Sequence, residues 1–158
     1  MRSAGVEDAA LLGKWWRDGD VMAHAGFPLG LKITNEQISE QIQRGSGTLI
    51  IEVEDSPIGE MSYCDIGEKT AQIGIKICKK DMQSKGYGLR FLRMLIGELF
   101  AQGFEKIILD TNVNNIAAQK TYEKLGFRKL RTNADVWKDQ MGVLQSSIDY
   151  ELTRENFD

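Results

Sequence analysis

Two glycines separated by one residue, Gly86 and Gly88, stand immediately before a run whose apolar residues recur at helical spacing. The first turn of a helix exposes backbone N–H groups that have no partner inside the helix, and the aligned peptide dipoles add about half a positive charge there. Glycines leave room for a phosphate to touch this backbone and tolerate unusual backbone angles. Lys85 and Arg90 add positive charge. Residues 83–88 therefore predict an anion-binding loop.

Two familiar nucleotide-binding motifs do not fit this loop. A P-loop requires Gly-Lys followed by Ser or Thr, and that sequence occurs nowhere in the chain. A dinucleotide-binding fingerprint requires a third glycine at the position where Phe91 stands, and it opens a βαβ unit, whereas the strands expected before this loop form a meander. The alternative without any ligand is a tight turn, which Gly-x-Gly also forms.

The hydrophobic pattern predicts the elements that position this loop. Helical spacing is expected over residues 7–17, 34–44 and 89–100, and Thr34 with Gln37 forms a capping box. Period-two runs with short turns between them predict an antiparallel meander of TLIIEVE, IGEMSYCDI and TAQIGIKIC. The remaining expected elements are an irregular stretch at 18–33, a strand at 106–111, a helix at about 116–125, strands at 127–132 and 146–153, and a polar excursion at 133–142.

This order of elements is α+β, or mixed α/β. No repeat or linker divides the 158 residues, so we expect a single domain over residues 1–158. The longest nearly apolar stretch, within 89–100, is far shorter than a membrane span of roughly twenty residues. The N-terminus carries acidic residues where a signal peptide would be apolar. We therefore expect a cytoplasmic protein without a membrane partner.

Charge and cysteine usage argue against several other functions. The formal net charge of −3 gives no footprint for nucleic acid. A local basic patch that could hold a small polyanion comprises Lys79, Lys80, Lys85, Arg90 and Arg93. Cys64 and Cys78 lack metal-ligand spacing and are expected to be buried strand thiols, so neither a disulfide nor a metal site is predicted. Cys78 also has no nearby histidine in sequence that would activate it as a nucleophile.

The glycine loop and a later segment together resemble the GNAT superfamily of N-acetyltransferases. QSKGYG matches that family's acetyl-CoA pyrophosphate loop, Gln/Arg-x-x-Gly-x-Gly/Ala, and NVNNIAAQKTYEKLGF at 112–127 is similar to its Asn-x-x-Ala-x-x-x-Tyr-x-x-x-Gly-Phe segment. The resemblance covers at least residues 48–131, and the longer loop before the glycines is most similar to the branch of ribosomal-protein N-terminal acetyltransferases. It implies a twisted, mostly antiparallel sheet flanked by helices, with two strands splayed apart at the acetyl-CoA site.

The resemblance also implies which residues hold acetyl-CoA, the acetyl donor. Main-chain groups of Ile75 and Ile77 would hydrogen-bond the pantetheine arm; both could be merely core residues, and because the contacts use the backbone the two interpretations can hold together. Asn115 would bind the same arm, cap the following helix, or do both. Gln83 would open the pyrophosphate loop, although many relatives have an arginine there, whose charge Lys85 or Arg90 could replace. The loop N–H groups that would hold the pyrophosphate belong to Lys85, Gly86, Tyr87, Gly88 and Leu89.

For catalysis, the resemblance implies that Tyr122 protonates the departing CoA thiolate, whereas otherwise it is a packed aromatic. The base that removes the proton from the acceptor amine is not evident. Relatives often have a glutamate where Gln72 stands, and glutamine cannot accept this proton. Glu60 and Asp65 are the substitutes, each of which could equally be a solvent-facing carboxylate.

The acceptor site is expected between the N-terminal helices and the C-terminal strands. Trp16, Asp20 and His24 concentrate chemistry suited to a cation in the N-terminal stretch, and the segment around Trp137 would close over them from the other side. Trp16 could instead hold its helix against the sheet.

The resemblance implies an acetyl-CoA-dependent N-acetyltransferase, in which a primary amine of a small molecule or of a protein N-terminus attacks the thioester directly. Two alternatives stay open. One is a non-catalytic acyl-CoA-binding or sensor domain, which Gln72 favours, and the other is an interaction module whose glycine loop is only structural. The sequence does not decide between a monomer and a homodimer, and it does not identify the acceptor.

Overall fold

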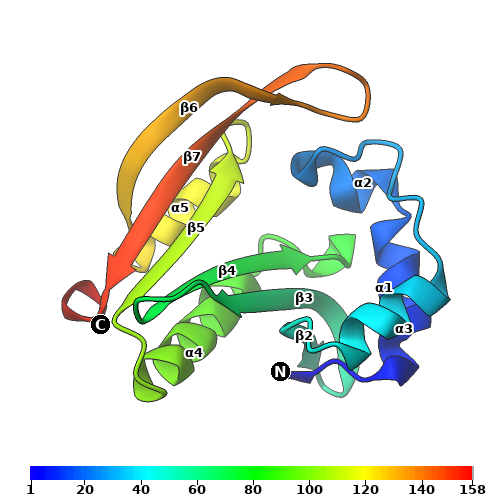
Figure 1. The fold of residues 1–158 in the computed structure, drawn as a ribbon, viewed down its shortest axis with the longest axis horizontal. Coiled ribbons are helices and arrows are strands. Elements are labelled where there is room, and N and C mark those ends of the chain that lie inside the picture. The colour runs from blue at the N-terminus through cyan, green and yellow to red at the C-terminus, as the bar shows by residue number, and fades with distance from the viewer. Residues whose placement is uncertain (158) are drawn as a thin grey trace.

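A seven-stranded sheet forms the centre of the molecule, and its strand order is β1-β2-β3-β4-β5-β7-β6 (Figure 1). The computed structural model describes residues 1–157. The strands are β1 (Arg2–Ser3), β2 (Thr48–Val53), β3 (Ser56–Asp65), β4 (Thr70–Ile77), β5 (Lys106–Asn112), β6 (Arg128–Lys138) and β7 (Leu144–Thr153). All neighbouring strands are antiparallel except β4 and β5, which run parallel. The predicted mixed α/β fold with a mostly antiparallel sheet is confirmed.

Helices cover both faces of this sheet. They are α1 (Ala9–Trp16), α2 (Gly19–Met22), α3 (Asn35–Gln43), α4 (Tyr87–Ala101) and α5 (Ile116–Lys124), with short 3-10 turns at Val6–Asp8, Ala23–Ala25, Lys80–Met82 and Arg154–Asn156. Figure 1 shows α1 and α3 beside β2 and β3 at one end, with α2 above them facing the tip of the β6–β7 hairpin, while α4 and α5 lie along the sheet. None of the helices within residues 1–157 is long and apolar enough to cross a membrane.

Alternation along the strands separates two cores, because successive strand residues point to opposite faces. Ile51 and Met61 pack with Leu92 of α4 in the larger core, whereas Ile50, the neighbour of Ile51, packs with Leu12 of α1 in the smaller one. We call the face that carries Ile50 the inner face. The inner face is covered by α1 and α3 at β2.

The predicted meander is confirmed as β2, β3 and β4, and so is the capping box of α3, in which Gln37 N donates to Thr34 Oγ1. The prediction of a polar loop over 133–142 is partly wrong, since β6 continues to Lys138. β6 is an edge strand and is exposed along most of its length, so its polar composition reflects solvent on both faces. A register shift between Asn133 and Trp137 accommodates the irregular residues within the strand.

Within the stretch expected to be irregular, α2 and a 3-10 turn form short helical segments. The expectation for the two cysteines is half right. Cys78 is buried just beyond β4, but Cys64 is exposed, because it lies toward the end of β3 that the helices leave open to solvent.

Candidate active site

The glycine loop leads directly into α4. Gly86 is the residue before the helix and has a left-handed backbone, with φ of 82°. The first intrahelical bond is donated by Arg90 N to Gly86 O at 3.1 Å. The N–H groups of Tyr87, Gly88 and Leu89 come before that bond and cannot have an intrahelical partner, and no side chain caps this end. The loop therefore presents a row of unpaired donors.

The space in front of these donors is open. Apart from its own neighbours along the chain, a Cβ added to Gly86 or Gly88 would meet no atom of residues 1–157 within 4 Å. The left-handed backbone explains glycine at position 86, but Gly88 lies in the first turn of the helix itself, and glycine is a poorer helix former than alanine, by up to about 1 kcal/mol in a helix interior. Neither packing nor backbone strain requires glycine at 88. The arrangement fits a phosphate group of acetyl-CoA that approaches the backbone closely.

β4 and β5 pair over only three residues, from Thr70 with Lys106 to Gln72 with Ile108. Beyond this point each strand continues to its own end, β4 to Ile77 and β5 to Asn112, without pairing with the other. The two strands are thus splayed, as the GNAT resemblance implied. Their facing edges leave main-chain groups available to a ligand that lies between them.

The predicted cofactor residues lie around this splayed region. Ile75 and Ile77 are partly buried against the larger core, so their side chains pack while their backbone forms the strand edge. The Gln83 side chain donates to Ile77 O at 2.9 Å and ties the loop to the end of β4. Asn115 Oδ1 accepts from Ala118 N at 3.2 Å, which confirms that it caps α5.

Tyr122 is buried on α5. Its ring meets Tyr150 edge-on at 5.6 Å between centroids and Phe127 at 5.8 Å. Burial, followed by the negative charge of Asp110, raises the pKa of Tyr122 to about 12. The phenol therefore keeps its proton at neutral pH, as a group that donates a proton must.

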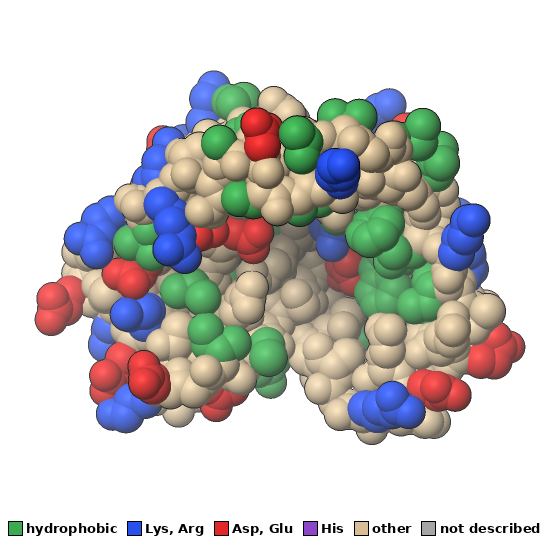
Figure 2. Space-filling view, turned by 45° about the horizontal axis from the view of Figure 1, so that its top comes forward, with side chains coloured by type: hydrophobic (Ala, Val, Ile, Leu, Met, Phe, Trp, Pro, Cys, Tyr) green, Lys and Arg blue, Asp and Glu red, His purple; other side chains and the backbone are tan. Residues whose placement is uncertain are grey.

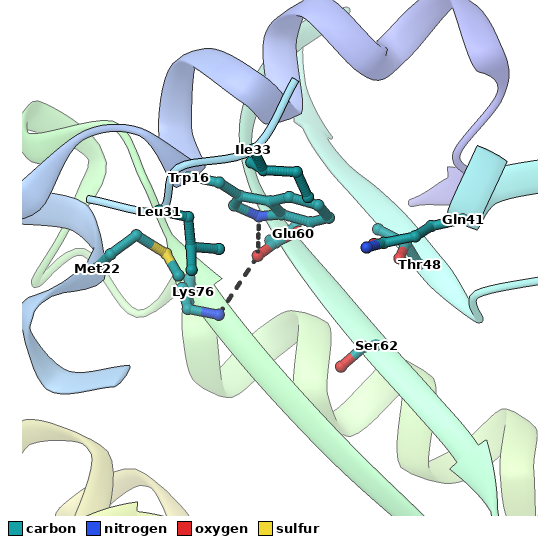
Figure 3. A pocket seen from close by; sticks show the side chains of 9 residues that line it. All are labelled: Trp16, Met22, Leu31, Ile33, Gln41, Thr48, Glu60, Ser62 and Lys76. Carbon is teal, nitrogen blue, oxygen red and sulfur yellow. Dashed lines mark hydrogen bonds and ion pairs between the residues drawn. The ribbon is translucent and has the colours of Figure 1, made fainter. Parts of the chain in front are cut away.

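The molecule is deeply hollowed beneath the β6–β7 hairpin, and charged side chains of both signs lie on the walls of the hollow (Figure 2). A pocket of about 270 Å³ opens on the inner face (Figure 3). Its lining residues are Trp16, Met22, Leu31, Ile33, Gln41, Thr48, Glu60, Ser62 and Lys76. An apolar roof from the N-terminal segments thus faces polar groups from the strands.

Two predicted residues, Trp16 and Glu60, meet in this pocket. The Trp16 indole donates to Glu60 Oε1 at 2.8 Å, and Lys76 Nζ lies 3.4 Å from the same oxygen (Figure 3). Glu60 is only 6% exposed, so these two partners take the place of the water that would otherwise hydrogen-bond its carboxylate. The sequence analysis missed Lys76 and Ser62, although period-two alternation places them on the inner face with Glu60.

Asp20 and His24 are exposed and do not line this pocket. Asp65 accepts from Gly67 N in the turn after β3 and lies outside the pocket as well. Cys78 is buried, and burial followed by the charge of Glu60 raises the pKa of its thiol to about 12. A thiol with this pKa is a poor nucleophile at neutral pH.

The β6–β7 hairpin reaches across to the N-terminal segment, as predicted for the region around Trp137. A Cβ on Gly26 would collide with the Trp137 ring, so the indole lies directly on this glycine. Gln140 N donates to Gly26 O at 2.9 Å, while its side chain accepts from Leu29 N at 2.8 Å and donates to Gly30 O at 3.0 Å. We call this contact the Gln140 bridge.

Comparison with known proteins agrees with this geometry. Residues 1–128 match the family model described as acetyltransferase (GNAT) domain. No curated protein sequence matches. Similar solved structures include a spermidine N-acetyltransferase from Vibrio cholerae in complex with CoA and spermine, with a TM-score of 0.85 and 17% identity, covering 98% of this chain and 95% of that one.

Two further structures are similar at a TM-score of 0.79. A ribosomal-protein-alanine N-acetyltransferase from Brucella melitensis is 17% identical, over 96% of this chain and 98% of that one. The yncA structure from Salmonella typhimurium, which contains its cofactor acetyl-CoA, is 18% identical, over 96% of this chain and 91% of that one. These likenesses establish the fold, and the family model covers most of the sequence. The chain belongs to the GNAT acetyltransferase family.

Proposed function

We propose that this protein is a single-domain enzyme that uses acetyl-CoA to acetylate a primary amine. The observation that carries the proposal is Gly88, a helical glycine that neither packing nor backbone angle requires, at the mouth of two splayed strands. A phosphate at this loop would accept hydrogen bonds from the free N–H groups at the start of α4, and an extended arm between the strands would bond to the unpaired main-chain groups of β4. The cofactor would supply an activated acetyl thioester.

The residues of the chain have distinct parts in this proposal. Gln83 fixes the loop against β4, and the N–H groups from Lys85 to Leu89 hold the pyrophosphate. Main-chain groups of Ile75 and Ile77, with Asn115, orient the pantetheine arm. Backbone N–H groups on the unpaired edge of β4 polarise the carbonyl oxygen, where developing negative charge is stabilised.

The reaction is a direct transfer. A neutral amine forms the new C–N bond with the acetyl carbon, the C–S bond breaks, and the leaving thiolate takes a proton from the Tyr122 phenol. Tyr122 regains a proton as the nitrogen loses one, so the products are an amide and free CoA thiol. Cys78 has no part in this route because its raised pKa keeps it protonated.

We place the acceptor in the hollow beneath the hairpin, with the Trp16, Glu60 and Lys76 pocket on one wall. The similar structures include an enzyme named for spermidine and one named for a ribosomal protein's alanine, so a small polyamine and a protein N-terminus are both candidates. Asp20 and His24 could contact an acceptor only at the entrance, since both are exposed.

Two measurements test the proposal. Isothermal titration with acetyl-CoA is expected to show one site, and the absence of binding would favour an interaction module. Thiol release from acetyl-CoA is then followed with polyamines, aminoglycosides, amino acids and short peptides. Release with at least one amine supports the enzyme, whereas binding without release from any of them favours the sensor alternative.

A further inference from the structure

The inner face of the sheet carries several carboxylates, and all but one have a cationic partner. They are Glu60 of β3, Asp110 of β5, and Asp149 and Glu151 of β7. Glu60 lies 3.4 Å from Lys76, and Asp149 lies 2.6 Å from Arg131. Glu151 has Lys106 at 3.3 Å and Arg128 at 3.2 Å.

Asp110 has no ion pair and no hydrogen bond from another side chain in the part of the chain that the structure describes. It lies two residues beyond Ile108, the last residue of β5 that pairs with β4. Its neighbour Leu109 points into the larger core, so alternation turns Asp110 toward the inner face. An unpaired carboxylate therefore stands at the opening of the splayed strands.

Asp110 is also close to the predicted proton donor. The charge of Asp110 contributes to the raised pKa of Tyr122, which requires the two groups to be near one another. Tyr122 belongs to α5, which packs on the core face, whereas Asp110 faces the hollow. The predicted proton donor therefore lies on the core side of the sheet and Asp110 on the side of the hollow.

The titratable groups around Asp110 set its basicity. Asp149 of β7 stands directly opposite in the strand register, with Arg131 of β6 beside it, Tyr122 approaches from α5, and the adjoining end of β4 presents the uncharged Gln72. Asp110 is itself exposed, and partial loss of its hydration, followed by the charge of Asp149, raises its pKa, while the hydrogen bond from Arg131 lowers the pKa of Asp149. Neighbouring carboxylates with pKa values pushed apart are a recurring feature of acid–base sites.

We propose that Asp110 is the catalytic base that removes the proton from the acceptor ammonium. The ammonium N–H bond breaks, the proton passes to an Asp110 carboxylate oxygen, and the electron pair left on nitrogen forms the C–N bond as the C–S bond breaks. The proton on Asp110 is then released to water. This inference rests on the proposed function and assigns to Asp110 the role that Gln72 cannot perform.

The first test measures the pKa of Asp110 in the absence of any ligand. The carboxyl carbon is titrated by NMR in the wild-type protein and in Asp149→Asn, and it is assigned in each protein by through-bond correlation to the backbone of Asp110. We expect Asp110 to titrate above the ordinary aspartate value, and to shift downward in Asp149→Asn because the opposing charge is gone and Arg131 remains. A wild-type value at or below the ordinary one overturns the inference.

The second test is kinetic and uses spermine and a short peptide with N-terminal alanine as probes. If wild-type protein releases no CoA thiol with either probe or with the wider amine panel, the proposed function itself fails. If wild-type protein is active, Asp110→Asn is expected to lower kcat by about 100-fold or more with little change in the KM for the amine. The defect should shrink as pH rises and more of the free amine is already neutral.

Three other outcomes overturn the assignment when wild-type protein is active. Asp110→Asn could keep kcat within about threefold of wild type, a smaller effect than loss of a general base produces. It could raise only the KM for the amine, which would make Asp110 a cation anchor. Glu60→Gln, rather than Asp110→Asn, could remove the acidic limb of the pH profile. Acetyl-CoA affinity and Tm verify that each variant is folded. If Asp110→Asn does not fold, the NMR titration of the wild-type protein decides whether Asp110 can be the base.

Discussion

Gly88 illustrates how one residue can show where a ligand lies. At the second position of α4 the backbone is helical and the space beside it is free, so alanine or another good helix former would fit there without strain. The chain nevertheless has glycine, which is understandable if another molecule needs that space. Local stability and binding therefore make opposite demands at this residue.

Gly88→Glu is expected to raise the Tm or leave it unchanged, because glutamate favours the helical conformation over glycine by up to about 0.5–1 kcal/mol. The same change should abolish acetyl-CoA binding, since it puts bulk and negative charge where phosphate would lie. Gly97→Ala is the matched control within α4, where a Cβ would come no closer than 4.0 Å to Phe157. Calorimetric titration of both variants tests this, and unaltered affinity in Gly88→Glu would contradict the placement of the loop.

Tyr122→Phe keeps the buried ring and removes only the phenol. If Tyr122 protonates the leaving thiolate, kcat should fall by about 100-fold or more while the Kd for acetyl-CoA changes little. The ring contacts with Tyr150 and Phe127 remain, so the Tm should stay close to that of wild type. Steady-state thiol release with acetyl-CoA titration separates the two effects, and equal activity would remove Tyr122 from the mechanism.

Among the elements, the β6–β7 hairpin has a role that its composition does not reveal. Its strands contribute an exposed edge, but its tip connects to the N-terminal segment through the Gln140 bridge. The hollow proposed for the acceptor is consequently closed over on this side. The amide of Gln140 both donates and accepts, which matches the backbone groups that it meets.

Gln140→Ala removes two of the three hydrogen bonds of the bridge and keeps the one from Gln140 N to Gly26 O. We expect faster amide exchange at Leu29, whose N–H loses its acceptor, and a higher KM for the amine because the wall of the hollow loosens. Hydrogen-exchange mass spectrometry measures the first effect. Gln102→Ala is a suitable control, since the Gln102 side chain donates to Glu98 one turn away on the same helix, and equal exchange in both variants would contradict the bridge.

The sequence predicted most elements because their signals are local. Capping by Thr34 and Asn115, the turn at Gly86 and the two periodicities depend on residues only a few positions apart. The extension of β6 to Lys138 was missed because an edge strand exposed on both faces has the composition of a loop. Asp110 was missed because its role depends on the register with β7 and on where β4 stops pairing, neither of which is local.

At the scale of the whole molecule, the first residues help to hold the N-terminal helices on the sheet. Arg2 of β1 donates to both carboxylate oxygens of Asp8, at 2.7 and 2.9 Å, and also to Glu52 of β2 at 3.0 Å. Asp8 is 5% exposed and also accepts from Gly5 N. The side-chain hydrogen bonds from Arg2 lower the pKa of Asp8.

A carboxyl whose pKa is lower in the folded than in the unfolded protein stabilises the fold at any pH above its unfolded-state pKa. That stabilisation is lost as the pH falls through the folded-state pKa. Asp8→Asn should therefore lower the Tm at neutral pH by about 3–6 °C. This corresponds to a loss of roughly 1–2 kcal/mol in the free energy of unfolding, a value kept small because Arg2 is partly exposed and its ion pair is screened by solvent. The difference from wild type should vanish in strong acid. Glu105→Gln, in the exposed pair with Lys69, should leave the Tm nearly unchanged. Thermal unfolding at several pH values checks both variants. A Tm difference between Asp8→Asn and wild type that does not change with pH would show that the charge of Asp8 is not its cause.

The short pairing of β4 with β5 also affects how the protein behaves among other chains. Bare strand edges at the rim of a sheet recruit further polypeptides and can start fibrils. In this protein the bare stretch lies in the middle of the strand order, with β3 on one side and β7 on the other. A foreign polypeptide finds no free rim there to extend, so this stretch keeps its backbone amides open to a slender ligand without adding a further edge to the sheet beside the one at β6.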